Sequence, residues 1–324
     1  MALCRIIPAM AAALVLSLPP AAQAETITVT HFGAQFYGAP YVVAREKGFF
    51  KEAGVDITGF LTSTGGGTSV RNTLASDLPY GEVALSAALE AIRAGQPLKI
   101  VSGGVESIGD ILWIAKPDSP LNGIKDLAGK RVGFSAPGSV TNMLLLMSLR
   151  KAGVDAKSVQ MVPAGGIGAN LSAVLTGALD AAFSGEPVWT QERGKVKPVF
   201  WAKDVLGAEM TQTVGVVTED FIKGHPEIIR AIIAGRAKGV EYLYAHPEEA
   251  ADLTAKAYNT DAALARNVFR HLQEIEWWGR GDLRYKGMNR MAEGMQIVGK
   301  LQGDVDWSKI VDTSFLPKEL QPKS

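Results

Sequence analysis

The chain has almost no cysteine and little histidine. Of its 324 residues, the only cysteine is Cys4, in an N-terminal segment that we expect to be removed. A mature chain without cysteine has no disulfide bond, no thiolate nucleophile and no cysteine metal site. The four histidines are His31, His225, His246 and His271, and no two are spaced like zinc ligands on a helix. We therefore expect neither a metal nor another cofactor.

Charge of either sign is not concentrated anywhere in the sequence. Lys and Arg together number 33, Asp and Glu also number 33, and basic residues form no dense run. Nucleic acids and membrane surfaces are therefore poor candidates for partners. Beyond the N-terminus, no segment is long and apolar enough to cross a membrane. We expect a soluble, folded mature protein.

The first 24 residues have the pattern of a secretory signal peptide. Arg5 supplies a positive charge, Met10–Leu18 is a short apolar run, and residues 22–24 (Ala-Gln-Ala) form a small-x-small cleavage pattern. A membrane anchor is the alternative, but the apolar run is too short to span a bilayer. We expect cleavage after Ala24. Export without disulfides fits the bacterial periplasm better than an animal extracellular space.

The remaining residues predict an α/β protein of two lobes. About 300 residues are too many for one ordinary core. Short apolar runs at 26–32 and 55–61 alternate with helical patterns at 39–54, ending at Gly54, and at about 68–76. A second series of the same kind begins near residue 122. Strands alternating with helices predict mostly parallel sheets.

The two series contain a weak internal repeat. Residues 82–86 and 180–184 both read as acid, apolar, Ala, apolar, Ser, and each follows a predicted helix. This match places Ser86 and Ser184 at equivalent positions about a hundred residues apart. Chance similarity between α/β units is the alternative. If the repeat is real, it predicts two similar lobes facing each other.

Two segments, 110–120 and 211–221, predict where the chain passes between the lobes. We expect residues 25–114 and 214–324 to form the first lobe and residues 115–213 to form an inserted second lobe. Two crossings make a hinge that can close on a ligand. The C-terminal third is mainly helical, with Pro226 and Pro247 at or near first-turn positions.

A glycine-rich loop lies within residues 61–72, LTSTGGGTSVRN. It lacks the lysine of a phosphate-binding P-loop and does not complete the G-x-G-x-x-G fingerprint, so a nucleotide site is excluded. Ser63, Thr64, Gly65 and Gly66 nevertheless follow a predicted strand and open a predicted helix. Free backbone N–H groups and the positive end of the helix dipole meet there, which favours an anion.

The second lobe has a counterpart in residues 135–142, SAPGSVTN. Ser139, Thr141 and Asn142 also follow a predicted strand and open a helix, and the hydroxyls can add donors to the backbone amides. The alternative is that Ser139 is only an N-cap and the glycines of the first loop only a turn. Two helix starts, one in each lobe, would converge on a ligand between strand carboxyl ends. The pairing favours an anion site.

Several segments together resemble a known family. They are GAPYVVAREKGFFKEAGVDI, LASDLPYGEVALS, LAGKRVGF, GSVTNMLLL and LTGALDAAFSGEPVW. In order and spacing these resemble the periplasmic substrate-binding proteins of ABC importers, in the nitrate, sulfonate, taurine and thiamine-pyrimidine-precursor group. The resemblance implies a bilobal type II periplasmic-binding-protein fold with a hinged cleft and no catalysis. It also implies a monomer that delivers a small anion to permease and ATPase subunits.

The resemblance also suggests residues of the first lobe that contact the ligand. Phe36 and Tyr37 follow the first predicted strand, where this family places ligand contacts, and their rings could stack on a ligand or enclose a small anion. Ordinary helix-start packing is the alternative. Ser86 and Ala87 are expected at the end of a strand, with their backbone facing the ligand.

Three more candidates come from the second lobe and the return crossing. Glu186 in SGEPVW matches the acid–proline element of the family. A carboxylate beside an anion site suggests a ligand that also carries an N–H or ammonium group, and a solvated or hinge-bonded glutamate is the alternative. Trp189 lies one turn further on and could close one side. Thr213, in the return crossing, is the weakest candidate.

Other functions stay open at this point. A pyrimidine-precursor synthase has the same fold, but it needs cysteines and histidine chemistry that this chain lacks. A periplasmic sensor subunit would need the same cleft as a transport protein. The ligand could also be a pyrimidine precursor or an aromatic acid, because a fold does not determine its ligand.

Overall fold

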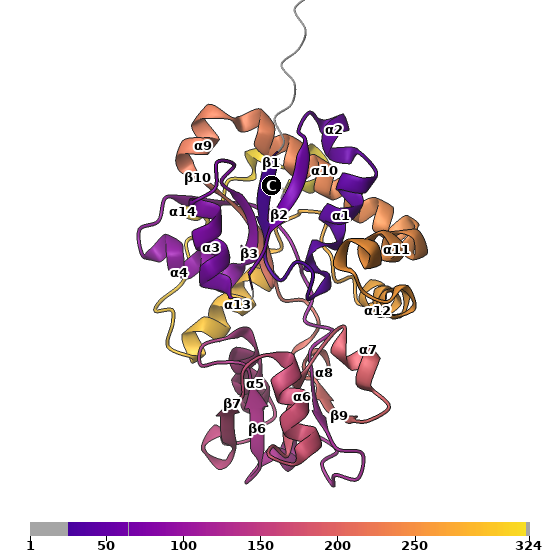
Figure 1. The fold of residues 1–324 in the computed structure, drawn as a ribbon. Coiled ribbons are helices and arrows are strands. Elements are labelled where there is room, and N and C mark those ends of the chain that lie inside the picture. Colours follow the sequence, from indigo (N-terminus) through magenta and orange to yellow (C-terminus); the bar gives the residue numbers. More distant parts are fainter. Residues whose placement is uncertain (1–24, 64, 322–324) are drawn as a thin grey trace, which may run out of the picture.

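The computed structural model describes residues 25–63 and 65–321. Figure 1 shows two lobes, with the first lobe above the second and the C-terminal helices packed on the first. The expected signal peptide, residues 1–24, lies outside the described residues, and so does Thr64.

The first lobe is built on a five-stranded sheet with the order β2-β1-β3-β10-β4. Strands β1, β2 and β3 are parallel, whereas β10 is antiparallel to both of its neighbours. Apolar side chains such as Ile27 and Val29 are fully buried, as expected for strands covered by helices. The strands are β1 (Glu25–Val29), β2 (Ile57–Leu61), β3 (Tyr80–Ala84), β4 (Leu98–Gly103) and β10 (Thr213–Thr218).

The second lobe repeats this arrangement in the order β7-β6-β8-β5-β9. Strands β6, β7 and β8 are parallel, and β5 is antiparallel to both neighbours. The strands are β5 (Leu112–Ala115), β6 (Arg131–Phe134), β7 (Gln160–Pro163), β8 (Ala181–Ser184) and β9 (Lys197–Trp201). The first expected lobe boundary, between residues 114 and 115, falls inside β5, because the chain has already joined the second sheet at Leu112.

The registers of the two sheets correct the match between Ser86 and Ser184. Ser184 ends β8 and pairs with Leu112, the first residue of the antiparallel strand β5. In the first sheet, Ala84 ends β3 and pairs with Thr213, the first residue of β10. Ala84 is therefore the counterpart of Ser184. The match was wrong by two residues. A shift of two residues keeps every side chain on the same face of a strand, so the apolar pattern does not reveal it.

Helices cover both faces of the first sheet, and most of the C-terminal helices pack beside it (Figure 1). Pro226 and Pro247 both stand at the first helical position, as predicted. The first-lobe helices are α1 (Ala39–Glu46), α2 (Phe49–Ala53), α3 (Gly66–Leu74), α4 (Leu85–Arg93), α9 (Glu219–Gly224), α10 (Pro226–Ala245), α11 (Pro247–Tyr258), α12 (Ala262–Glu274), α13 (Tyr285–Ile297) and α14 (Trp307–Ile310). Short 3-10 turns are η1 (Phe36–Gly38), η4 (Thr313–Phe315) and η5 (Lys318–Leu320).

One predicted helix is broken in two. The pattern over residues 39–54 predicts a single helix, but α1 ends before Gly48 and α2 begins after it. Gly48 has φ of 77°, a left-handed conformation that glycine adopts without a steric penalty. Gly54, with φ of 102°, ends α2 at the predicted place.

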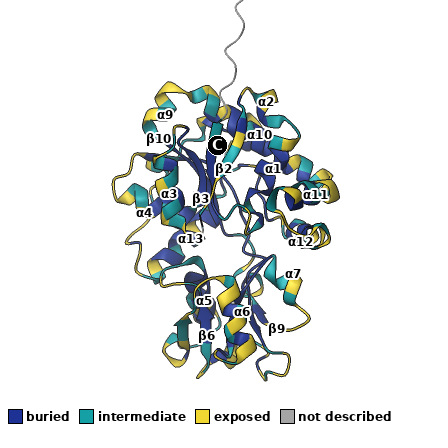
Figure 2. Ribbon diagram, viewed as in Figure 1, coloured by how far each residue is buried: buried dark blue, intermediate teal, exposed yellow. Residues whose placement is uncertain are grey.

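Fewer helices surround the second sheet. They are α5 (Val140–Lys151), α6 (Ile167–Thr176), α7 (Val188–Glu192) and α8 (Ala202–Leu206), with short 3-10 turns η2 (Ile124–Leu127) and η3 (Ala156–Ser158). Figure 2 shows the strands of both lobes as mainly buried and the outer helix faces as exposed. Within the described residues, no helix combines the length and the apolar character that crossing a membrane requires.

Two crossings, residues 104–111 and 207–212, connect the lobes. They bond to each other along the backbone: Gln212 N–H donates to the Val105 carbonyl at 2.7 Å, and Met210 N–H donates to the Glu106 carbonyl at 3.0 Å. Ile108 N–H donates to Ala208 at 2.9 Å. The crossings therefore form a narrow two-stranded connection, the geometry that a hinge requires.

Candidate functional site

Each lobe presents loops at the carboxyl edge of its parallel strands. In the first lobe these loops follow β1 and β2, and in the second they follow β6, β7 and β8. Helices α3, α5 and α6 begin at these loops, so several helix starts gather at the two edges. In open α/β sheets, ligands bind outside the carboxyl ends of the strands. We therefore built the candidate site from these loops and from the hinge between them.

Among the described residues, no side chain caps the start of α3. Its N-cap is Gly65, which is exposed, and in the ranges 25–63 and 65–321 no side chain accepts from the first amides of the helix. The hydroxyls beside it form a chain, in which Ser63 Oγ lies 2.8 Å from Ser69 Oγ and Ser69 Oγ donates to Thr30 Oγ1 at 3.1 Å. The first N–H groups of a helix lack intrahelical partners, so this helix start can receive an anion.

Gly66 is required by packing at the same place. A Cβ atom on Gly66 would lie 2.8 Å from the Cβ of Ala87, closer than two such atoms approach. The predicted role of Gly66, a close backbone approach to the ligand, therefore has a structural alternative in the contact between α3 and α4. At Gly67 a Cβ would meet nothing closer than an Arg71 nitrogen at 3.6 Å.

The start of α5 is capped by its own side chains. Ser139 Oγ accepts from Asn142 N–H at 3.2 Å, and Asn142 Oδ1 accepts from Gly138 N–H at 2.9 Å. Thr141 Oγ1 accepts from Ser135 N–H at 2.9 Å. The N-cap alternative considered for Ser139 is thus realised. The two helix starts differ: within the described ranges no side chain caps α3, whereas Ser139 caps the Asn142 amide of α5.

A polar cluster lies at the hinge between the two edges. Tyr37 Oη donates to Gln212 Oε1 at 2.8 Å, and Gln212 Nε2 donates to the Ser107 carbonyl at 2.6 Å. Trp277 Nε1 donates to Asp110 Oδ1 at 2.9 Å. The ring of Tyr37 packs against Trp277, with centroids 4.7 Å apart. Tyr37, expected to contact the ligand, is therefore held at the junction of the lobes.

Asp110 is a buried acid in this cluster. Burial is the main cause that raises the pKa of Asp110 to about 7, and the charge of Glu186 acts in the same direction. The hydrogen bond from Trp277 opposes this change. At neutral pH the carboxyl group can therefore either donate or accept a hydrogen bond.

Glu186 links the lobes. It follows β8, is 3% exposed, and accepts from Thr190 Oγ1 at 2.9 Å. Its Oε1 lies 2.6 Å from Nδ1 of His271, which belongs to α12 on the first lobe. The hydrogen bond to Glu186 raises the pKa of His271. The hinge-bonded alternative for Glu186 therefore has direct support, since its oxygens are occupied by protein partners.

Two tryptophans stand beside this link. Trp189, on α7, lies edge to face with Trp201 at 5.4 Å between ring centroids. Trp201 in turn lies 5.5 Å from the ring of His271. Both tryptophans are half-buried. That Trp189 closes one side of the ligand site stays a prediction. Trp277 and Trp278 are both buried, with their rings at 85° to each other.

Other predicted residues are placed differently. Phe36 is 3% exposed, and its ring packs against Tyr258 and Phe269, so helix packing uses its aromatic faces. Thr213 Oγ1 accepts from Val105 N–H and donates to Glu82, which makes it a buried part of the hinge. Both side chains are therefore structural.

Ser86 and Ala87 need a second correction. The sequence predicts them at the end of a strand, but β3 ends at Ala84 and α4 begins at Leu85. Both residues lie in the first turn of α4, where they are half-buried. They stay near the carboxyl edge of the sheet, in a helical rather than an extended backbone.

Sequence reasoning missed residues that complete the site. Asp110 and Gln212 carry a weak signal, because they are polar residues at the ends of the two crossings, next to the apolar strands β5 and β10. His271 and Trp201 carry none, because their positions depend on how the lobes meet. No Lys or Arg belongs to the assembled set, which combines acids, aromatic rings, hydroxyls and backbone amides. Within the described ranges, no group of three or more potential ligand residues could hold a metal ion.

Comparisons with known proteins bear on the family and the fold. The family model described as NMT1/THI5 like matches residues 35–250. The riboflavin-binding protein RibY of Chloroflexus aurantiacus is 25% identical over 317 residues, covering 92% of this chain and 87% of that protein. The periplasmic aliphatic sulphonate binding protein SsuA of Escherichia coli has a TM-score of 0.73 at 16% identity, covering 90% of this chain and 97% of that chain. The desulfurization enzyme DszB has a TM-score of 0.65 at 17% identity, with the same coverage.

These similarities have different weight. Structural neighbours at such low identity establish the fold, and the fold is shared by binding proteins and by an enzyme. The family model spans more than half of the chain. The chain belongs to the NMT1/THI5-like family and has the bilobal fold of the periplasmic binding proteins.

Proposed function

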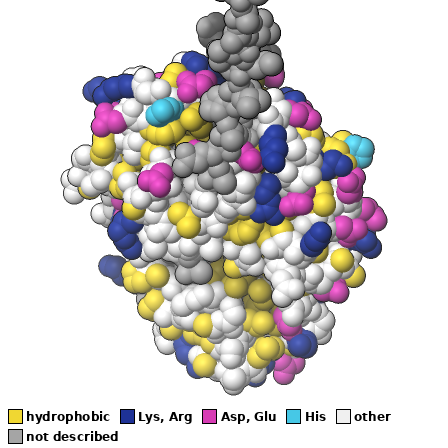
Figure 3. Space-filling model, turned by 45° about the horizontal axis from the view of Figure 1, so that its top comes forward, with side chains coloured by type: hydrophobic (Ala, Val, Ile, Leu, Met, Phe, Trp, Pro, Cys, Tyr) yellow, Lys and Arg dark blue, Asp and Glu magenta, His cyan; other side chains and the backbone are white. Residues whose placement is uncertain are grey.

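We propose that this protein is the periplasmic solute-binding component of an ABC importer. It captures a small organic or inorganic anion, of the sulfonate, taurine or nitrate kind, between its two lobes and delivers it as a monomer to permease and ATPase subunits. Family membership, the bilobal fold and the hinge support this role. Signal-peptide cleavage after Ala24 would place it in the periplasm. On the face shown in Figure 3, acidic and basic side chains are interspersed over the first lobe, which fits a soluble carrier.

The uncapped start of α3 is the observation that carries the anion proposal. Gly65 offers no side-chain acceptor, and Ser63 Oγ, which donates to the Gly65 carbonyl at 3.0 Å, can turn towards a ligand beside the first amides of the helix. A carboxylate, sulfonate or nitrate oxygen can accept from these donors without a cationic side chain. The capped start of α5 adds only its dipole and the hydroxyls of the loop before it.

A second ligand class is favoured by the acids. Asp110 and Glu186 lie near each other at the hinge, and half-buried rings of Tyr37, Trp189 and Trp201 surround this region. Aromatic rings with N–H groups, such as pyrimidines, suit carboxylate acceptors and aromatic walls. A pyrimidine-precursor or aromatic-acid ligand is therefore the alternative within the same transport role.

Catalysis and sensing are weaker proposals. The mature chain has no cysteine to act as nucleophile, although a desulfurization enzyme shares the fold. A sensor subunit would use the same ligand site, and neighbouring genes for a permease and an ATPase would favour transport over sensing.

A ligand screen with paired variants tests the anion site. Mature protein is screened by thermal shift against sulfonates, nitrate, small carboxylates, aromatic acids and pyrimidines, and hits are titrated by calorimetry. Ser63→Ala should weaken anion binding by about tenfold, the value of one hydrogen bond to a charged group. Ser76→Ala is the matched control, because Ser76 follows α3 at its other end, where its Oγ donates to Thr26. Equal affinities for both variants would place the anion elsewhere.

Asp110→Asn separates the two ligand classes. This substitution should weaken the binding of pyrimidines by about tenfold, because pyrimidine N–H groups would donate to the Asp110 carboxylate. The binding of plain sulfonates and nitrate should stay nearly unchanged, because these anions have no N–H group to donate. Equal losses for both classes would assign Asp110 to the hinge. Glu186→Gln is less informative about the ligand, since its oxygens already accept from Thr190 and bond to His271.

A further inference from the structure

A cavity lies at the hinge, apart from the candidate site. It has a volume of about 290 Å³ and is bounded by the far part of α5, the middle of α13, the end of α8 and both crossings. Its lining residues on α5 begin at Met147, two turns beyond the helix start that faces the candidate site. None of the side chains that assemble the candidate site lines this cavity.

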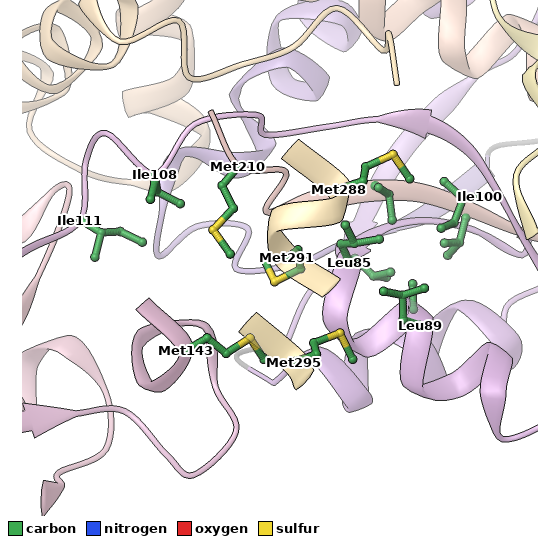
Figure 4. Packing of buried hydrophobic residues seen from close by; sticks show 14 of the residues in the cluster. Leu85, Leu89, Ile100, Ile108, Ile111, Met143, Met210, Met288, Met291 and Met295 are labelled. Atoms are coloured by element: carbon green, nitrogen blue, oxygen red, sulfur yellow. The ribbon is translucent and has the colours of Figure 1, made fainter. Parts of the chain in front are cut away.

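The floor of the cavity is apolar and adaptable. Ile108 and Met210 come from the two crossings, Met147 comes from α5, and all three are buried. Figure 4 shows Ile108 and Met210 together with Met143, Met291 and Met295 in the apolar cluster that continues from the hinge between the lobes. Methionine side chains are flexible and polarisable, so they fit apolar groups of varied shape.

The rim of the cavity is basic. Arg150 and Lys151 stand on α5, and Arg290 stands on α13. Arg150 forms an ion pair with Glu293. Arg290 donates to the backbone carbonyl of Glu209 at 2.9 Å. Among the described residues, neither Lys151 nor Arg290 has a carboxylate within ion-pair distance. The rim therefore carries three cations against the one carboxylate that lines the cavity, Glu293.

We propose that this cavity binds a small amphiphilic anion. A carboxylate or sulfonate head would lie at Lys151 and Arg290, and a short alkyl chain would lie on Met147 and Met210. The volume is at the lower end of the range for ligand pockets, which suits a chain of a few carbons. Because cations and apolar floor face the same space, neither a simple ion nor a neutral chain satisfies both surfaces.

Binding of such a ligand would depend on the angle between the lobes. The cavity takes walls from both lobes and from both crossings, so any change of the angle between the lobes changes its shape. A molecule that fits one shape better shifts the protein toward that angle. This site would then act on the orientation of the lobes without touching the α3 start.

The test is a titration of the mature protein with hexanoate, followed by ¹³C-methyl methionine NMR. Hexanoate should shift the methyl resonances of Met147 and Met210 and leave Met161, on β7 of the second lobe, unchanged. Hexan-1-ol, which has the chain without the charge, and acetate, which has the charge without the chain, should each bind at least about fivefold more weakly. Unmoved Met147 and Met210 resonances at saturating hexanoate, or equal binding of hexan-1-ol, would overturn the proposal.

Paired variants locate the head group. Lys151→Gln should weaken hexanoate binding about twofold, as expected for the loss of an exposed ion pair. The double variant, which also carries Arg290→Gln, should weaken hexanoate binding about fivefold. Lys157→Gln, another exposed lysine of the second lobe, is the control and should have no effect. The Lys151 variant keeps the test valid if loss of the Arg290 bond to Glu209 disturbs folding. Hexanoate affinity that is unchanged in both variants would contradict the assignment.

Discussion

The lobes touch on two sides of the hinge, and the two contacts have opposite chemistry. In the polar contact, Glu186 of the second lobe bonds to His271 of α12 at 2.6 Å. In the methionine contact, α5 packs against α13: a Cβ on Gly294 would lie 3.1 Å from the Cβ of Met143 and 3.2 Å from the sulfur of Met147. A short charge-assisted hydrogen bond depends on the distance and direction between its two partners. Thioether side chains can repack as helices slide.

This difference indicates how the lobes could move. Opening must break the polar contact, because its two partners are single side chains on opposite lobes. The methionine contact can stay buried through a change of angle, because its side chains can adjust. The two sides of the hinge therefore contribute differently to stability and to pH dependence, and each can be tested alone.

Truncation in the methionine contact should have the largest effect. Met143 is fully buried, so Met143→Ala should lower the free energy of unfolding by about 2–5 kcal/mol through lost burial and a cavity. Urea unfolding measures this loss. Met161→Ala, at a half-buried position of β7, is the control and should cost clearly less. Equal losses would mean that the methionine contact is loosely packed.

The crossing between the two contacts holds a buried acid with a strong pH dependence. Burial raises the pKa of Glu106 from 4.5 to about 8, so the folded protein favours the protonated form. Its contribution to stability is therefore complete below pH 4.5 and is lost as pH rises towards 8. Glu106→Gln should remove this loss and raise stability at pH 9 by a few kcal/mol relative to wild type.

Thermal unfolding of both proteins from pH 5 to 9 measures this difference. The stability gap between variant and wild type should widen with pH and level off above about pH 8. A gap that does not change with pH would show that Glu106 does not titrate in this range.

Removing the polar contact should have a smaller effect with a defined pH window. The pKa of His271 is raised, mainly by its hydrogen bond to Glu186. The resulting stabilisation is complete below the ordinary histidine pKa of 6.5 and is lost as pH rises through the higher folded value. His271→Gln should therefore cost about 1–2 kcal/mol at pH 6 and little at high pH. Melting curves of variant and wild type that stay parallel from pH 6 to 9 would contradict this assignment.

The ion pair at the edge of the methionine contact should matter least. Arg150 and Glu293 have side chains that are 61% and 45% exposed, unlike the buried Glu186. Arg150→Gln should change stability by at most about 0.5 kcal/mol, and high salt should erase the change. A larger, salt-resistant loss measured by urea unfolding would show that charge as well as methionine packing holds this side.

Local signals predicted much of the fold from the sequence. Pro226 and Pro247 begin helices where a missing N–H is tolerated, and Gly54, with φ of 102°, ends α2. The alternation of strands and helices predicted two parallel-type sheets, and the topology confirms them. These features depend on neighbours in sequence, so the sequence alone reveals them.

The candidate site was predicted less completely, because it depends on long-range placement. The partners Glu186 and His271 are 85 positions apart and lie on different lobes. Phe36 is an aromatic residue at a position where a ligand contact was expected. In the structure, Tyr258 and Phe269 of the C-terminal helices pack against its ring. No local sequence pattern indicates the bond between Glu186 and His271 or the packing of Phe36. The glycine-rich loop was located correctly, but only the structure shows that α3 is uncapped whereas Ser139 caps α5.

Small-angle scattering of the mature protein, with and without the tightest-binding compound of the ligand screen, tests the central claim most directly. The account predicts that a saturating ligand draws the lobes together, so the radius of gyration falls, and that Ser63→Ala needs more ligand for the same change whereas Ser76→Ala does not. Tight binding with an unchanged scattering profile would contradict a ligand site that closes between the lobes.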